Sequence, residues 1–481
     1  MGFFVHQYTF YIYLCSSFLA VMEKLRFTSK IKKRLYWLLS SAIRFFHNVL
    51  YYRHIYLVGK ENIPPVHTPL LIVSNHQNAL NDPLGILFSF NDRVVTIFTR
   101  GDIFRRRFVG RILRSLYLLP AYRLNVDGED TLKYNDIMFK EAGDRLLGGH
   151  AVAIFPEGIN QTKRWLGDFS SAYLKMAFET AERDNFEKDI VIMPMCNHYS
   201  DYFGMRSDMM LKFGKPISLK PYYELYKEKP RTAQRTVNHL VRQEIEGLML
   251  NINDLDNYEA IDYLRNTYGI KYAQRLYVNP HVLPEKLFAD KKLVAELDRL
   301  KAENPELSKQ IYERAIELRN KFISYKIKEE DLDRQDSRFS SVLMGIAFAL
   351  LLPIFVISMT PNVLVYYSVE PIAQRFKRKG GKAAMFTSGV RFAMMSLYSL
   401  PLFWTLFIVL EWIYLGWIVA LCHAVLLVPS TLFGLHYIKE FKTWVKQTKF
   451  FITKKKNYDK LNELLKLRND LFLTLDNNLK I

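Results

Sequence analysis

Short, continuous runs of apolar residues alternate with amphipathic stretches through the first half of the chain. The apolar runs occupy residues 55–58, 70–73, 94–98, 151–155 and 190–195, and helical patterns fill 131–147 and 170–184. Such an alternation is typical of a mostly parallel sheet flanked by helices on both faces. We therefore expect an α/β domain over residues 54–254, with functional groups gathered where the strands end.

The next part of the chain, residues 255–336, is helical and highly charged. Two amphipathic segments within 284–328 are joined by Glu303-Asn304-Pro305, a sequence that ends one helix and begins another. The pattern predicts an αα-hairpin. We find no catalytic pattern here and expect a structural or regulatory helical extension.

Three long runs without Asp, Glu, Lys or Arg follow, at residues 339–369, 392–410 and 412–438. Each is long enough to span a bilayer, or nearly so. The segment 375–382 and the tail 439–481 are both basic, so both are expected on the cytoplasmic side. Three simple crossings would place one of them outside.

This conflict leads to a specific prediction for the membrane region, residues 339–438. Residues 339–369, interrupted by Pro353 and Pro361, are expected to form a re-entrant or interfacial hairpin. Residues 392–436 are then a two-helix hairpin with Glu411 near its far tip, and 439–481 is a basic cytoplasmic tail.

The N-terminal part has two patterns. Residues 1–21 are apolar but form a poor signal peptide and a short span; an equal alternative is that translation starts at Met22. Residues 22–53 combine clustered Lys and Arg with an aromatic-rich apolar stretch. This pattern favours an amphipathic helix at the membrane interface, and the alternative is an ordinary helix packed on the domain.

The formal net charge of +19 implies an anionic partner: nucleic acid, an anionic membrane surface or a phosphorylated substrate. The basic residues flank apolar, membrane-like segments, which favours the membrane over a nucleic-acid groove. The three cysteines are far apart and match no metal or redox spacing. We therefore expect no metal and a soluble part that faces a reducing compartment.

The first candidate for chemistry is the polar sequence from Ser74 to Pro83, directly after a predicted buried strand. A histidine there, His76, can take a proton from a hydroxyl near neutral pH if a carboxylate orients it, and Asp82 is the nearest carboxylate. The simpler explanation is a hydrogen-bonded loop histidine and an aspartate that caps a helix before Pro83. This spacing alone favours the simpler explanation.

A second candidate is an arginine cluster after the predicted strand 94–98. Guanidinium groups bind phosphate oxygens in a bidentate manner, and a strand-to-helix loop offers free backbone N–H groups. Arg100, Arg105 and Arg106 lie nearest the loop. A solvated or lipid-facing basic helix is the simpler explanation for Arg107, Arg111 and Arg114, and Arg123 continues the positive surface.

Two further sequences end predicted strands. Phe155-Pro156-Glu157-Gly158 forces a sharp exit, which places Glu157 where a substrate hydroxyl could be held; a plain turn with a solvated glutamate is an equal alternative. Met193-Pro194-Met195 is suited to shape an apolar pocket, although core packing alone would explain it.

Taken together, Asn-His…Asp, Gly-Asp-Ile-Phe-Arg-Arg, Phe-Pro-Glu-Gly and a late proline-containing strand resemble the four blocks of the PlsC-type glycerophospholipid acyltransferase superfamily. The resemblance covers roughly residues 50–250. It implies that His76 is the general base and Asp82 its partner. It further implies that the phosphate-bearing acceptor is bound by Arg100, Gly101, Arg105, Arg106, Glu157 and Gly158, and that the acyl pocket involves Phe104, Phe155 and Pro194.

Two departures from the family pattern matter. The first block usually reads H-x4-D, whereas here Asn81 occupies the expected position and Asp82 follows, giving H-x5-D. One residue turns a side chain by ~100° on a helix, so the loop must bulge for Asp82 to reach His76. The third block usually continues Thr-Arg, whereas this chain has Ile159-Asn160. Both departures are similar to the glycerol-3-phosphate/dihydroxyacetone-phosphate acyltransferase branch.

The resemblance thus implies an integral membrane enzyme with its catalytic domain on the cytoplasmic face. It would transfer a fatty acyl group from acyl-CoA or acyl carrier protein to glycerol 3-phosphate, and in addition to dihydroxyacetone phosphate, without a cofactor. One alternative is acylation of 1-acylglycerol 3-phosphate to phosphatidate. Another is a non-catalytic membrane scaffold whose arginines bind anionic lipid. Expected partners are the phosphorylated acceptor, the thioester donor and membrane lipids, and no nucleic acid.

Overall fold

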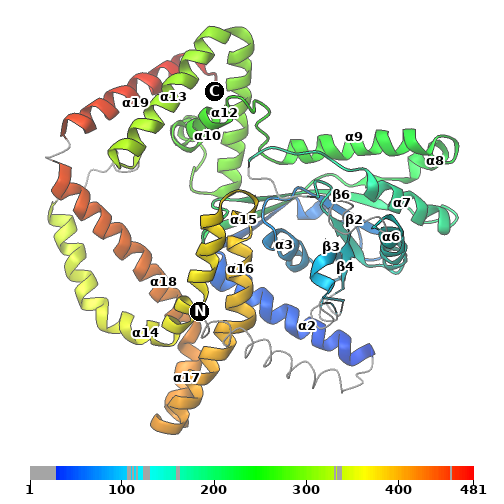
Figure 1. Ribbon diagram of the computed structural model, residues 1–481, viewed down its shortest axis with the longest axis horizontal. Coiled ribbons are helices and arrows are strands. Elements are labelled where there is room, and N and C mark those ends of the chain that lie inside the picture. Colours follow the sequence, from blue (N-terminus) through cyan, green and yellow to red (C-terminus); the bar gives the residue numbers. More distant parts are fainter. Residues whose placement is uncertain are drawn as a thin grey trace.

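The computed structural model describes residues 29–105, 110, 113–114, 117–122, 131–158, 163–329, 332, 338–454 and 458–481. The apolar stretch 1–21 and the alternative start at Met22 lie outside these residues. The described chain forms an α/β domain, a helical bundle and a group of long apolar helices (Figure 1).

The α/β domain is built on an eight-stranded sheet of order β1-β7-β6-β2-β5-β3-β4, with β8 paired to β6. The strands are β1 (His54–Val58), β2 (Leu70–Ser74), β3 (Val95–Arg100), β4 (Leu118–Ala121), β5 (Ala151–Ile154), β6 (Val191–Tyr199), β7 (Asp208–Phe213) and β8 (Ile217–Ser218). All neighbouring pairs are parallel except β6–β7 and β6–β8. The five strands expected from the apolar runs are present, and β4, β7 and β8 are additional.

Both faces of the sheet are covered, as the continuous apolar runs require. In β2, Leu71 and Val73 face one core, whereas Leu70 and Ile72 face the other. The first core is closed by α6 (Thr131–Leu147), α7 (Ala172–Arg183), α8 (Tyr223–Glu228) and α9 (Pro230–Leu248). The second core is closed by α3 (Asn81–Ser89) and the π-helical turn η1 (Phe46–Tyr51). The expected α/β sheet with helices on both faces is confirmed.

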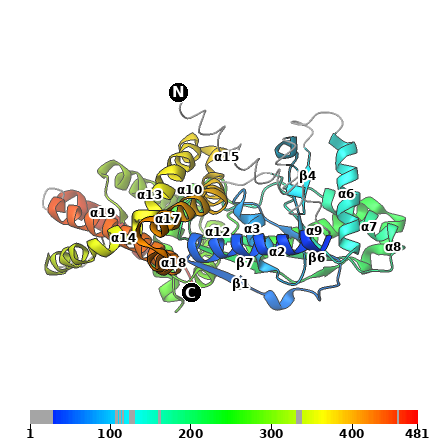
Figure 2. The ribbon, with the colours of Figure 1, turned by 90° about the horizontal axis from the view of Figure 1, so that it is seen from below.

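The amphipathic stretch near the N-terminus forms α2 (Ser29–Phe45), which continues into η1. Figures 1 and 2 place α2 along the side of the α/β domain from which the apolar helix α17 (Leu400–Leu415) projects. Leu38 and Phe45 of α2 are exposed. Exposed apolar side chains on a basic helix fit the predicted membrane interface.

The charged extension is a helical bundle of α10 (Tyr258–Asn266), α11 (Tyr268–Arg275), α12 (Leu283–Glu303) and α13 (Pro305–Tyr325). The turn between α12 and α13 is Asn304, whose side chain accepts a hydrogen bond from the N–H of Leu307, so the αα-hairpin is confirmed. The expectation that 439–481 is a basic cytoplasmic tail stays a prediction. The last part of this segment forms α19 (Tyr458–Asn478), whose leucines join the bundle core and whose Asp476 pairs with Lys271 and Arg275.

The three apolar runs lie in helices long and apolar enough to cross a membrane, at Ser340–Lys379, Thr387–Leu415 and Trp417–Phe450. The predicted hairpin over 339–369 is wrong in its local form, because Arg338–Lys379 is one continuous helix, α14, that keeps Pro353 and Pro361 inside it. Figure 1 shows α14 curving strongly rather than breaking, which internal prolines explain.

The second predicted hairpin has the expected form. Helix α16 (Thr387–Met394) continues through the π-helical turn η6 (Met395–Ser399) into α17, and the chain reverses at Gly416 into α18 (Trp417–Lys454). Gly416 has φ 94°, a conformation that favours glycine. Near this tip Glu411 of α17 accepts a hydrogen bond from His423 of α18. The only carboxylate in the apolar part of the hairpin thus has a partner on the opposite helix.

Two flanks of the apolar helices meet the rest of the protein. The short helix α15 (Gly381–Ala384) joins α14 to α16, where Arg391 donates a hydrogen bond to the carbonyl of Phe203 and pairs with Glu370. The far end of α18 leads to α19 in the bundle. We therefore expect tags placed after residue 380 and at the C-terminus to show the same accessibility to protease in sealed vesicles. Protection of one tag and digestion of the other would contradict this topology.

Candidate active site

The candidate site begins where β2, a central strand, ends at Ser74. The side chain of Asn75 is fixed to β6: its amide donates to the carbonyl of Asn197 at 3.1 Å and accepts from the N–H of Asn197 at 2.7 Å. The Asn197 amide also donates to the Ser74 hydroxyl at 3.0 Å. Because all three side chains are buried, these bonds define the direction in which the chain leaves the sheet.

The structure brings the two predicted catalytic side chains together. His76 Nδ1 lies 2.9 Å from Asp82 Oδ2. Asp82 is completely buried, whereas the His76 side chain is 16% exposed. A proton on Nδ1 shared with the carboxylate leaves Nε2 as the basic nitrogen, and among the described residues Nε2 has no hydrogen-bond partner. The ring is therefore arranged to take a proton from a group that enters the site.

The loop between the two residues explains how an aspartate six positions after the histidine can reach it. Helix α3 begins at Asn81, and the loop before it wraps around the Asp82 carboxylate. Oδ2 accepts hydrogen bonds from the N–H groups of Gln77 and Asn78, both at 2.7 Å, and Oδ1 accepts one from the Tyr199 hydroxyl at 2.6 Å. The predicted bulge is present, and the carboxylate at its centre organises it.

Glu157 lies on the other side of the histidine. Its Oε1 accepts a hydrogen bond from the backbone N–H of His76 at 2.8 Å, and Oε2 accepts one from the N–H of Gly167 at 3.2 Å. Burial raises the pKa of Glu157 to about 7, although both N–H groups lower it. Each oxygen keeps a second lone pair, so the expected role in placing an acceptor stays a prediction. Its observed contacts position the loop, and the solvated alternative is wrong because Glu157 is buried.

A stability prediction follows from Glu157. Its pKa in the folded protein lies above the value of 4.5 for an exposed glutamate, so the folded state binds more protons between pH 4.5 and 7. Its contribution to stability is therefore fully present below pH 4.5 and is lost as pH rises through 7. We expect wild type to exceed Glu157→Gln in thermal stability at pH 5, because the Gln amide would face a backbone donor. We expect this gap to shrink by pH 8, by on the order of 3 kcal/mol.

Thermal unfolding of both proteins in one detergent at pH 5, 6, 7 and 8 measures the gap. A gap that widens as pH rises would contradict the assigned protonation of Glu157.

Two other predicted residues flank the same turn. The Phe155 ring stacks on the His76 ring with 4.3 Å between centroids. Gly158 follows at φ 64°, which a residue with a side chain rarely adopts. Phe155 therefore fixes the plane of the imidazole, and its expected place in an acyl pocket stays a prediction.

The arginine block follows β3 as expected. Arg100 makes a bidentate ion pair with Asp102, with contacts of 3.1 and 2.6 Å, and its side chain is 46% exposed. Gly101 begins the turn η3 (Gly101–Arg105) and packs so closely on Tyr122 that a Cβ would lie 2.6 Å from its ring. The Arg105 side chain and all of Arg106, Arg107, Arg111 and Arg123 lie outside the described residues. The arginines' role in phosphate binding stays a prediction.

The remaining acyl-pocket residues are buried in different places. Phe104 is buried, and the guanidinium of Arg114 lies 5.6 Å from the centroid of the Phe104 ring. Arg114 is exposed, which agrees with the simpler explanation given for it. Pro194 lies in β6 opposite Val73 of β2. On its side away from β2, β6 pairs with β8 at Val191–Ile192 and with β7 at Met195–Tyr199, and Pro194 lies between these two pairings. The proline thus occupies a point between two ladders, where its missing N–H costs no strand pairing.

Sequence reasoning missed how the apolar helices contact this site. The Asn81 amide donates to the hydroxyl of Ser388 on α16 at 2.8 Å, and the Tyr51 hydroxyl donates to the carbonyl of Ser388 at 2.7 Å. Next to it, Gly389 packs on Leu80 so closely that a Cβ would lie 2.6 Å from the Leu80 Cβ. The only local signal is the small, polar sequence Thr387-Ser388-Gly389 at the start of an apolar run. Asn81, which stands where the usual H-x4-D spacing has its aspartate, thus donates a hydrogen bond to α16.

Parts of the chain are similar to known proteins. Residues 54–198 match the protein-family model described as Acyltransferase. The chain is 25% identical over 305 residues to an uncharacterized acyltransferase of Schizosaccharomyces pombe, covering 60% of this chain but 41% of that protein, so it spans about two fifths of the relative's length. Among solved structures it is similar to the 1-acyl-sn-glycerophosphate acyltransferase PlsC of Thermotoga maritima, with 18% identity, a TM-score of 0.33, and coverage of 50% of this chain and 92% of that one.

Proposed function

Because residues 54–198 form a domain of the Acyltransferase family, we propose that this protein transfers a fatty acyl group from a thioester to a hydroxyl of glycerol 3-phosphate. The product is lysophosphatidate, the first intermediate of phospholipid biosynthesis, and dihydroxyacetone phosphate is a second acceptor. One observation carries the proposal: the contact of 2.9 Å between His76 Nδ1 and Asp82 Oδ2, while the other ring nitrogen has no hydrogen-bond partner among the described residues.

The chemistry needs few groups, because a thioester is already reactive. The acceptor hydroxyl gives its proton to Nε2 of His76 as its oxygen attacks the thioester carbonyl carbon. Asp82 stabilises the positive charge that the ring then carries. When the tetrahedral intermediate collapses, the carbon–sulfur bond breaks, and the proton returns from His76 to the leaving thiolate. The free thiol is CoA or acyl carrier protein, and no acyl-enzyme is formed.

The acceptor's phosphate is assigned to the arginine block. Arg100 already presents its guanidinium in a fixed orientation through Asp102, and a phosphate can replace or share that carboxylate. Arg105 and Arg106 follow in the same loop. We propose that these three side chains hold the phosphate while the acceptor hydroxyl faces His76.

The long apolar helices fit membrane association, and we propose that the catalytic domain lies on the cytoplasmic side. Of the two basic segments, 375–382 lies next to α15, and the chain after Lys439 leads to the helical bundle (Figure 1). Basic flanks are retained on the cytoplasmic side of membranes. A water-soluble phosphate acceptor and a thioester donor would both reach the site from there.

The contact between α16 and the catalytic loop leads to a kinetic prediction. Gly389→Leu would push α16 away from Leu80, which shifts the loop that carries Asp82. We expect kcat to fall by roughly 10- to 100-fold, since small misplacements of catalytic groups have effects of that size, with little change in the acceptor's KM. The matched control is Gly247→Leu, another helical glycine, whose Cβ would meet nothing within 4 Å. A rise in KM at unchanged kcat would contradict the positioning role.

The function itself is tested with the purified, detergent-solubilised full chain. A labelled acyl thioester, as CoA or acyl carrier protein ester, is offered with glycerol 3-phosphate, dihydroxyacetone phosphate or lysophosphatidate in parallel. Labelled lysophosphatidate from glycerol 3-phosphate is the expected product. Phosphatidate formed only from lysophosphatidate would assign the protein to the second acylation instead. No product from any acceptor would favour a non-catalytic membrane scaffold.

A further inference from the structure

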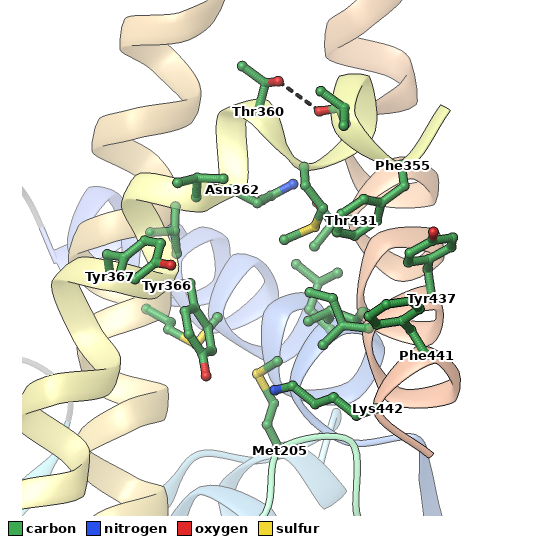
Figure 3. A pocket seen from close by; sticks show the side chains of 18 of the residues that line it. Met205, Phe355, Thr360, Asn362, Tyr366, Tyr367, Thr431, Tyr437, Phe441 and Lys442 are labelled. Carbon is green, nitrogen blue, oxygen red and sulfur yellow. Dashed lines mark hydrogen bonds between the residues drawn. The ribbon is translucent and has the colours of Figure 1, made fainter. Parts of the chain in front are cut away.

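A large cavity lies among the apolar helices, away from the catalytic histidine. Its volume is about 940 Å³, within the range of small-molecule sites. The walls come from α14, α18, η1 and the segment from α16 to α17, and Figure 3 shows their side chains converging on it. None of the predicted site residues that the structure describes lines this cavity.

The lining is almost entirely apolar. Phe46 and Leu50 come from η1, Phe355 and Val363 from α14, and Leu435 from α18. Water needs several polar partners to occupy a buried space, and an apolar cavity of this size does not supply them. Val356 and Tyr367, which also line the cavity, are largely exposed, so it opens to the surface of the apolar helices. In a membrane that surface faces acyl chains.

One end of the cavity carries a cation. Lys442 of α18 lines it, and in Figure 3 its side chain is directed inward, toward Met205. Among the described residues Lys442 has no ion-pair partner, whereas many of the soluble part's lysines are paired. A lysine at the end of an apolar cavity, on a helix whose following turns are basic, favours an anionic headgroup over a zwitterionic one.

Two residues, Tyr51 and Ser388, connect the cavity to the catalytic loop. The Tyr51 ring lines the cavity, while the Tyr51 hydroxyl donates to Ser388, whose own hydroxyl accepts from Asn81. Phe392 lines the same wall and lies edge-on to Tyr51, with 5.2 Å between ring centroids. A ligand in the cavity therefore supports the wall that holds α16 against the H-x5-D loop.

We propose that this cavity is a binding site for an anionic glycerophospholipid of the surrounding membrane. One acyl chain fills the space between α14 and α18, and the phosphate lies near Lys442. The bound lipid is a resident one rather than a substrate, because Tyr51, Ser388 and Asn81 separate the cavity from His76. It stabilises the packing of the apolar helices on the catalytic domain.

The test measures lipid retained by the full chain. Protein purified in detergent is stripped of lipid, incubated with micelles of phosphatidylglycerol, phosphatidylcholine or lysophosphatidate, and passed through gel filtration. Lipid per chain is then determined by mass spectrometry. Thr431→Phe and Val363→Phe each place a ring in the cavity, Lys442→Gln removes the cation, and Lys446→Gln is a charge control one helical turn away that does not line the cavity.

We expect wild type to retain about one phosphatidylglycerol per chain. Thr431→Phe and Val363→Phe should retain at least about tenfold less. Lys442→Gln should retain about fivefold less, and Lys446→Gln as much as wild type. His76→Ala should also retain lipid like wild type, so failure of the catalytic proposal and failure of this one are distinguishable.

Three results would overturn the proposal. Equal retention by wild type and by both filled variants, each monodisperse and helical by circular dichroism, would exclude the cavity as the site. Equal retention of phosphatidylcholine and phosphatidylglycerol would exclude an anionic headgroup at Lys442. Preferential retention of lysophosphatidate over phosphatidylglycerol would replace the resident lipid by the reaction product.

Discussion

Replacing His76 by alanine is expected to lower acyl transfer at least about 10³-fold while the protein stays folded in the membrane. The ring is the group that takes the acceptor proton in the proposed reaction, and no other described base lies against it except the buried Asp82 and Glu157, which are occupied by backbone N–H groups. The measurement is kcat and KM for glycerol 3-phosphate with a labelled acyl thioester.

The matched control is His67→Ala, because His67 is an exposed histidine of the same domain and has no predicted role. Its activity should equal that of wild type. Added imidazole should restore part of the activity of His76→Ala, since it can occupy the space next to Phe155 and accept the proton. Full turnover by His76→Ala without imidazole would refute the assignment of the base.

Local sequence patterns predicted those helices and strands that are determined by the residues within the segment itself. The helical pattern over 131–147 coincides with α6, and Pro305 marks the start of α13, because an amphipathic period and a capped proline act within one segment. The apolar runs became β1, β2, β3, β5 and β6 for the same reason. The position of His76 after β2 then followed from the general rule that sites form where parallel strands end.

Features that depend on distant partners were not predictable in this way. Strand β7 pairs with both β1 and β6, and nothing in residues 208–213 alone indicates those partners. Helix α19 belongs to the bundle because Leu464 and Leu471 meet α13 across more than a hundred residues. Its high charge alone gives no indication of that packing. The basic flanks suggested a hairpin over 339–369, and Pro353 and Pro361 were consistent with it, since a bend and a break in a helix have the same sequence signal.

The same distinction applies within the site. The H-x5-D spacing indicated a bulge, but not the groups that close it. Tyr199 is 117 residues from Asp82, and Ser388 is 307 residues from Asn81, so both contacts exist only in the folded chain. The departure from the usual H-x4-D spacing therefore has two consequences. The loop between His76 and Asp82 is longer, and Asn81 binds this loop to α16. The loop of the candidate site is thus in direct contact with an apolar helix.

The second large effect is expected from Asp82→Asn, which should lower kcat on the order of 10³-fold with a much smaller effect on KM. The asparagine can keep the local structure: its oxygen would accept from the N–H groups of Gln77 and Asn78, and its amide would face the Tyr199 hydroxyl, which can also accept. What it removes is the negative charge next to His76. The ring would then gain a proton in the transition state without a carboxylate to stabilise it.

Tyr199→Phe separates charge from packing in this prediction. It removes one donor to Asp82 and leaves both the carboxylate and its contact with His76, so kcat should fall by no more than about tenfold. Thermal unfolding of both variants shows whether either has lost its fold. If Asp82→Asn were as active as wild type, Asp82 would be an element of loop structure alone, and His76 would act without a carboxylate partner. If Tyr199→Phe lost as much activity as Asp82→Asn, the shape of the loop would matter more than the charge at its centre.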